Sequence, residues 1–286
     1  MIGPAIRLYP AGYRAAYGAE IADIHREMTA GMPRAARLRA DADLAAHAAR
    51  LRFGLHSAAP AGRVFATAAP FALGASAVVH GLWLAWWYAG LVRSPAPAGL
   101  QLATLPLDSG LFLLFSVLVC VGAVVALCGR RMAGTAVAVT GLLGSAALGA
   151  ATGEPALSLA AALTAVCVAL ACPPGRRHDR LTLKAAGVMT GCAWLPAMVV
   201  GTHAFGVSTD YGAWPLLVLA ASGAAVALRE RSHGLREAAA VALASPPLIA
   251  QACTTWGDTR PVLGAVLALG LTVAVPAGFL LLRRRP

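Results

Sequence analysis

Long apolar runs follow one another along most of the chain, and short stretches rich in arginine, proline or glycine separate them. A helix needs roughly 20 residues to cross the hydrocarbon core of a bilayer, with a range of about 17 to 25. Runs that meet or approach this length occupy residues 64–92, 110–128, 132–151, 155–171, 181–201, 212–228, 237–252 and 261–282. The pattern therefore predicts an all-α fold, a polytopic transmembrane helix bundle of about eight spans.

The sequence does not define the ends of two of these runs. The run 64–92 is overlong, and Pro70 marks either a kink within it or its true beginning. The run 237–252 is the shortest, and the Pro246–Pro247 pair interrupts it. The sequence alone does not decide whether these two runs cross the membrane completely.

Basic residues are distributed unevenly between the runs. With a cytoplasmic N-terminus and eight alternating spans, all but two of the 23 lysine and arginine residues lie on the cytoplasmic side. The two exceptions are Arg93 and Arg260. Such a bias orients multi-pass proteins with their basic loops inside. We therefore expect a protein of the inner (plasma) membrane with both termini in the cytoplasm and the lipid bilayer as a partner.

The composition supports a membrane protein and excludes other classes. Hydrophobic residues make up 59% of the chain and charged residues 12%, whereas soluble domains contain about 25% charged residues. The net charge of +11 follows from basic cytoplasmic loops that face anionic lipid, so we expect no nucleic-acid partner. The first 60 residues lack the apolar core and cleavage site of a signal peptide, so we expect them to stay on the chain.

Residues 1–63 differ from the rest and predict a separate cytoplasmic unit, a hairpin of two amphipathic helices that precedes the transmembrane bundle at 64–286. Pro10 suits the first turn of the first helix, and Gly31 and Pro33 separate it from the second. Two short helices bury little core alone, so they need each other, the membrane surface or a partner. The aromatic and aliphatic residues that we expect to dock a partner are Tyr9, Tyr13, Tyr17, Ile21, Ile24 and Met28.

The same stretch carries a family resemblance in the series Leu8-Tyr9-Pro10, Tyr13-Arg14, Tyr17-Gly18 and Glu20. Residues 6–28 resemble the short helical N-terminal prefix of bacterial ABC-exporter permeases and of uncharacterised multi-pass membrane proteins of actinobacteria. Ile21 departs from this pattern, which usually has Met or Leu there. The resemblance implies a module and not an activity. The partner that these helices dock would be a cytoplasmic ATPase or a regulatory protein.

Small residues recur at helical spacing in two of the runs. Stripes of this kind let helix backbones approach closely in lipid, where no hydrophobic effect drives helices together. We therefore expect helix-packing roles for Gly141, Ser145, Gly149, Gly153, Gly187 and Gly191.

Ionisable residues are scarce inside the runs. His80 lies deep in one run and His203 at the outer end of another, and these two form the candidate polar site. An intramembrane histidine can mark a proton or ligand pathway. No carboxylate lies in the interior of any run, so we interpret His80 instead as a neutral imidazole hydrogen-bonded between helices.

The outer loops contain a histidine and several carboxylates, which are ligand types for a divalent cation. Their spacing matches no ligand motif, and acidic outer loops are the ordinary counterpart of basic inner ones, so we expect no metal and no cofactor. Phosphate-binding, zinc-protease and nucleophile-elbow motifs are also missing from the sequence, so no catalytic residue is predicted. The loop residues are Asp108, Glu154, His203, Asp210 and Asp258.

Three functions remain in order of preference. The first is a non-enzymatic integral membrane protein, an accessory or regulatory subunit whose N-terminal helices dock a cytoplasmic partner. The second is a transporter component, a permease for a small hydrophobic or amphipathic compound, whose uncharged lining agrees with the lack of intramembrane carboxylates. The third is an intramembrane enzyme. The substrate, the partner and the oligomeric state are not specified by the sequence.

Overall fold

The computed structural model describes residues 4–55, 59–171, 180–201, 214–230 and 235–256. The described segments form helices joined by turns and contain no strand, so the all-α prediction is confirmed for this part of the chain. The chain divides into two compact units between Arg63 and Val64, where its composition also changes. Each unit is described by itself.

The first unit is a helical hairpin with a short turn of 3-10 helix in front of it. The 3-10 helix η1 spans Pro4–Leu8, and helices α1 and α2 span Ala11–Thr29 and Arg34–Arg52. Between the helices Gly31 adopts a φ of 76°, a left-handed conformation that glycine reaches without steric cost. Proline then precedes α2, where its missing N–H removes no helical hydrogen bond.

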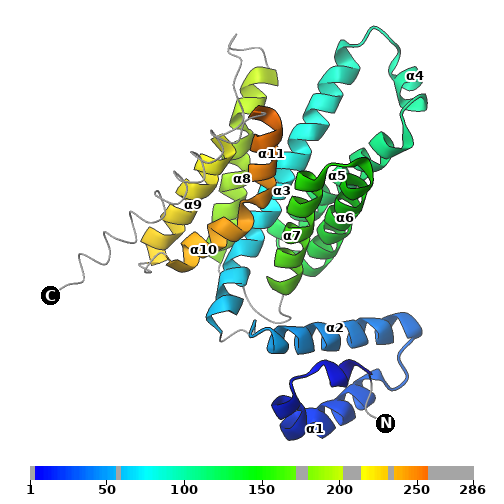
Figure 1. Cartoon of the computed structure of the whole chain (residues 1–286), viewed down its shortest axis with the longest axis vertical. Coiled ribbons are helices and arrows are strands. Elements are labelled where there is room, and N and C mark those ends of the chain that lie inside the picture. The colour runs from blue at the N-terminus through cyan, green and yellow to red at the C-terminus, as the bar shows by residue number, and fades with distance from the viewer. Residues whose placement is uncertain (1–3, 56–58, 172–179, 202–213, 231–234, 257–286) are drawn as a thin grey trace, which may run out of the picture. The chain divides into compact units, whose positions relative to one another are not determined.

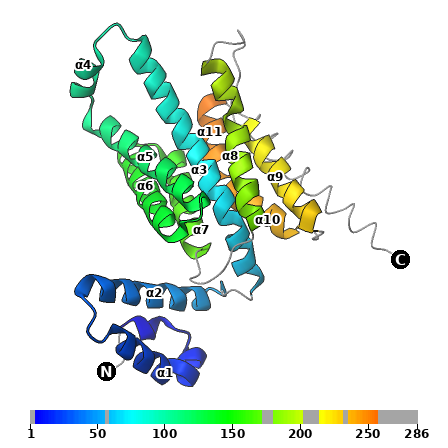
Figure 2. The same cartoon turned by 180° about the vertical axis from the view of Figure 1, so that it is seen from behind.

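The second unit is built around one long helix. Helix α3 runs from Pro60 to Arg93 and continues through Pro70. Figures 1 and 2 show α3 between one group formed by α5, α6 and α7 and another formed by α8, α9, α10 and α11. Its middle third is almost entirely buried and supplies much of the apolar core, including Phe71, Val78 and Leu82. The remaining helices are α4 (Ala98–Ala103), α5 (Leu107–Leu127), α6 (Arg131–Thr152), α7 (Pro155–Ala171), α8 (Arg180–Gly201), α9 (Trp214–Glu230), α10 (Leu235–Ala244) and α11 (Pro246–Trp256).

Three of the described helices, α3, α5 and α6, are long and apolar enough to cross a membrane. Helix α7 and the segments 181–195 and 214–229 are apolar but shorter. The predicted run 237–252 consists of two short helices that meet at Pro246, where the proline pair interrupts the helical hydrogen bonds. The predicted run 261–282 lies outside the described residues.

Glycines bring the backbones of α5 and α6 into contact. A Cβ added to Gly141 would lie 2.8 Å from the carbonyl oxygen of Phe115, and one added to Gly122 would lie 2.8 Å from Cα of Ala138. Gly134 approaches the backbone of Ala126 in the same way. Gly141 therefore has the expected packing role, and the sequence interpretation missed Gly122 and Gly134.

The other predicted packing positions differ among themselves. Ser145 is buried, and a Cβ added to Gly149 would lie 3.3 Å from Cβ of Ser158 on α7. Gly153 instead ends α6 in a left-handed conformation with a φ of 81°.

Gly187 and Gly191 on α8 do not pack against any described helix. Both are exposed, and no described atom comes within 4 Å of an added Cβ. The glycines that allow α3 and α8 to approach closely lie on α3. Gly74 makes room for Met189 of α8, and Gly81 makes room for Trp194 of α8. In the described part of the chain these two glycines therefore have no packing neighbour, since glycine spacing shows where a backbone is accessible but not which face has a neighbour.

Candidate functional site

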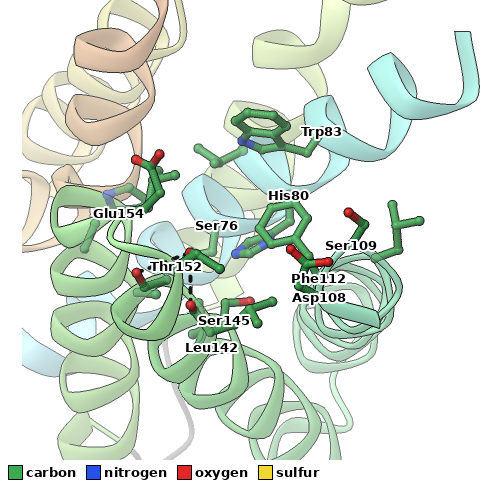
Figure 3. Close-up of a pocket in the computed structure, with 18 of the residues that line it drawn as sticks. Ser76, His80, Trp83, Asp108, Ser109, Phe112, Leu142, Ser145, Thr152 and Glu154 are labelled. Carbon is green, nitrogen blue, oxygen red and sulfur yellow. Dashed lines mark hydrogen bonds between the residues drawn. The ribbon is translucent and has the colours of Figure 1, made fainter. Parts of the chain in front are cut away.

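A cavity of about 460 Å³ lies within the second unit among α3, α5, α6, α7 and α11 (Figure 3). Helix α3 contributes Ser76, His80, Trp83 and Trp87, which follow one another at steps of four, three and four residues. This spacing places them on one face of the helix. The face combines polar and aromatic groups inside an otherwise apolar helix, and this pattern is a signal of the cavity that the sequence contains and that His80 alone does not give.

The interior of the cavity contains hydroxyl groups without hydrogen-bond partners. Ser76 on α3 is completely buried and Ser145 on α6 is nearly so. Both Oγ atoms lack a hydrogen-bond partner among the described residues. Leaving a buried hydroxyl unpaired costs about 1–3 kcal/mol. A polar group of a bound molecule that comes within hydrogen-bonding distance of either Oγ would recover this energy.

His80 lies beside these serines and is bonded to a neighbouring helix. Its Nδ1 lies 3.0 Å from Oγ of Ser116 on α5, and both side chains are buried. This is the geometry expected of an imidazole that joins two helices. Ser116 is not among the lining residues, so a compound in the cavity does not reach its hydroxyl. The pair therefore lacks the accessible nucleophile of a serine hydrolase. His203, the other residue of the candidate polar site, lies outside the described residues.

Aromatic rings form one wall of the cavity. The rings of Trp83 and Phe112 meet edge to face with centroids 5.8 Å apart, and the rings of His80 and Phe112 are 6.2 Å apart. The indole N–H of Trp83 donates a hydrogen bond of 2.9 Å to Oε1 of Gln251 on α11. This bond and the ring contact together restrict the orientation of the Trp83 side chain.

Two carboxylates lie at the margin of the cavity. Asp108 is in the first turn of α5, and Glu154 directly precedes α7. Both side chains are exposed. Helix N-termini favour nearby anions, which agrees with both positions. Among the described lining residues these carboxylates are the charged groups, and neither arginine nor lysine accompanies them.

In the first unit the predicted docking stripe divides into an interior part and an exposed part. Tyr9 is buried, with its ring 5.4 Å from that of Tyr13, and is therefore an interior residue rather than a docking residue. Ile21 is half-buried. In contrast, Tyr17, Ile24 and Met28 are about half exposed, at 50%, 49% and 58%.

Polar contacts join α2 to α1 and to the segment in front of α1. The Tyr9 hydroxyl lies 2.8 Å from Nδ1 of His47, and Nε2 of His25 lies 2.8 Å from Oδ1 of Asp41. Burial lowers the pKa of His47, and the positive charge of Arg50 lowers it further. Burial, followed by Tyr13, raises the pKa of Tyr9, although Arg50 opposes this shift. Both shifts favour neutral groups, so the Tyr9 O–H donates to an unprotonated imidazole nitrogen.

One buried charge escaped the sequence analysis. Glu237, which was assigned to the end of a span, is only 1% exposed on α10. Its Oε1 lies 2.7 Å from a guanidinium nitrogen of Arg236. The adjacent arginine was visible in the sequence, but the burial depends on how α10 packs against α9 and α7.

No protein-family model, no curated protein and no solved structure matches the chain. In the described part of the chain no group of three or more His, Cys, Asp or Glu side chains is placed to hold a metal ion. The cavity in the second unit and the exposed stripe of the first unit are therefore the features from which a function can be inferred.

Proposed function

We propose that this chain is a non-enzymatic integral protein of the plasma membrane that binds a small amphipathic compound inside its helix bundle, as a permease component does. The observation that carries this proposal is the cavity of about 460 Å³ with its unpaired serine hydroxyls. Small-molecule sites have volumes of about 300–1,000 Å³ and combine an apolar wall with a few polar groups. The aromatic wall and the hydroxyls of Ser76 and Ser145 meet this description.

The proposed topology has eight spans and cytoplasmic termini. It is supported by the distribution of basic residues and by helices at most of the predicted positions. In this topology the N-terminus of α5 and the turn between α6 and α7 face the outside. Because Asp108 and Glu154 occupy these positions, the margin of the cavity would be on the outer side of the membrane.

A binding assay tests the proposal on the full chain in lipid nanodiscs. We expect 3-phenylpropanol, which carries an aromatic ring and one hydroxyl, to quench or shift tryptophan fluorescence because Trp83 and Trp87 line the cavity. Ser145→Leu adds bulk in the cavity and should abolish the signal. The control is Thr140→Leu, at an exposed position on the same helix. Absence of binding by a folded parent protein, or equal binding by Ser145→Leu, contradicts the proposal.

A second function, partner docking by the N-terminal hairpin, is favoured by a separate observation. Tyr17, Ile24 and Met28 form an exposed apolar stripe on α1, and exposed apolar surface of this kind is typical of interaction sites. The partner would be a cytoplasmic ATPase or a regulatory protein, and the resemblance of residues 6–28 to a permease prefix agrees with a docking module.

Docking is tested by quantitative co-purification of the tagged full chain from its native membrane. Tyr17→Asp places a charge at the N-terminal end of the stripe and should remove the co-purified ATPase or regulator, because burying an unpaired charge is costly. Glu20→Ala, at an exposed position outside the stripe, is the control. Recovery of the same proteins by Tyr17→Asp and by the parent contradicts the docking function.

A further inference from the structure

The charges at the margin of the cavity indicate the sign of its ligand. The charged lining residues among those described are two carboxylates, Asp108 and Glu154, and no basic side chain accompanies them. Low-dielectric walls concentrate the field of such charges within a cleft. The cavity should therefore attract cations and repel anions.

The aromatic wall provides a second feature that suits a cation. Trp83, Trp87 and Phe112 line the cavity, and Figure 3 shows Phe112 next to Asp108. The face of an aromatic ring attracts an ammonium group, most strongly in the case of tryptophan. The hydrogen bond from Trp83 to Gln251 and the edge contact with Phe112 hold the Trp83 ring in place before a ligand arrives. Such preorganisation reduces the cost of binding.

The unpaired hydroxyls provide a third, independent feature. Ser76 Oγ and Ser145 Oγ are buried in the cavity wall without partners among the described residues. A hydroxyl oxygen accepts hydrogen bonds from an ammonium N–H and is attracted to the polarised C–H groups of a quaternary ammonium. The ligand also needs an apolar part to contact the leucines that line the cavity, Leu142, Leu148 and Leu157.

We propose that the cavity binds an organic cation, an amine or quaternary ammonium attached to a small apolar body. This inference rests on the proposed function and specifies the ligand class. An organic cation fits better than a metal ion, because no group of three or more metal-ligating side chains is found in the described structure. Asp108 and Glu154 attract the charge, the aromatic rings contact it, and the leucines contact the apolar body.

The test compares three probes of similar size on the full chain in nanodiscs. Benzyltrimethylammonium carries the positive charge, neopentylbenzene is its neutral carbon isostere, and phenylmethanesulfonate is an anion. Binding is measured by tryptophan fluorescence after subtraction of the signal from empty nanodiscs. We expect the cation to bind about tenfold more tightly than the neutral isostere and the anion to bind least. High salt should reduce the preference, because both carboxylates are exposed and therefore screened.

Variants identify the side chains responsible for the preference for a cation. Asp108→Asn combined with Glu154→Gln should weaken binding of the cation about five- to tenfold and change binding of the neutral isostere less than twofold. The control is Asp43→Asn, which removes an exposed carboxylate from α2 in the other unit.

Each outcome separates the two proposals. Equal affinity for the cation and the neutral isostere, or an unchanged cation affinity in the double variant, overturns the ligand class and leaves the proposed function standing if 3-phenylpropanol binds. Failure of all four compounds to bind the folded protein overturns the proposed function and the ligand class together.

Discussion

Trp83 on α3 donates its indole N–H to the amide oxygen of Gln251 on α11 at 2.9 Å, across 168 residues of chain. The bond joins the central helix to the helix that follows Pro246. It also fixes one aromatic ring of the cavity wall. A single polar contact thus connects the packing of the second unit with the shape of its cavity.

Gln251→Leu should lower the free energy of unfolding by about 1 kcal/mol, the net value of a typical hydrogen bond between helices. It should also weaken binding of 3-phenylpropanol, because the Trp83 ring loses its restraint. Thermal unfolding in nanodiscs and the fluorescence assay measure the two effects. Thr140→Val is the control, since the Thr140 hydroxyl bonds to a carbonyl of its own helix. An equal loss of stability in both variants would mean that the hydrogen bond between α3 and α11 does not stabilise the second unit.

Gly134→Ala should destabilise the second unit by about 1–3 kcal/mol. The added Cβ would lie 2.6 Å from the carbonyl oxygen of Gly122 and 2.7 Å from Cα of Ala126, so α5 and α6 must separate. Gly187→Ala should be neutral or slightly stabilising, because its Cβ meets no described atom within 4 Å and alanine favours a helix. The stability of both variants is measured by unfolding in nanodiscs and compared with that of the parent protein. A comparable loss in Gly187→Ala would show that residues outside the described structure pack on this face of α8.

The pH dependence of the N-terminal hairpin should follow His47. Its pKa in the folded protein lies below the ordinary value of 6.5, so the unfolded chain binds more protons between the two values. Stability of the hairpin should therefore be complete above about pH 6.5 and decrease as the pH falls through the lower folded pKa.

NMR titration of histidine-labelled full chain measures the pKa of His47 directly. Tyr9→Phe removes the O–H that stabilises the neutral imidazole, so it should raise the pKa of His47 toward 6.5. Tyr17→Phe, which removes a hydroxyl from an exposed ring, is the matched control. A His47 pKa at or above 6.5 in the parent protein would contradict this account.

Reporter fusions test the proposed topology. Fusions in the turn 129–132 and in the segment 173–180 should report the cytoplasm, and fusions in 94–105 and 203–211 should report the outside. The physical reason is that basic loops stay on the cytoplasmic side, where all but two of the 23 lysines and arginines are placed by this arrangement. A cytoplasmic signal from the segment 203–211 would require a different number of spans.

The sequence by itself determined where most of the longer described helices lie and how apolar they are. Apolar runs and the breaks at glycine and proline are local features, because each helical hydrogen bond joins residues only four positions apart. The turn at Gly31 and the interruption at Pro246 could therefore be predicted without knowledge of the neighbouring helices. The helical character of the described chain was predictable for the same reason.

Only the tertiary structure decided which face of each helix has a neighbour. Gly134 packs against a backbone whereas Gly187 is exposed, and Tyr9 is interior whereas Tyr17, two turns further along, is half exposed. The cavity likewise requires Ser76 on α3 and Ser145 on α6 to lie across the same space, although they are far apart in the chain. Such pairings depend on the sum of many weak packing contacts between distant segments, and the spacing of residues within one helix does not encode them.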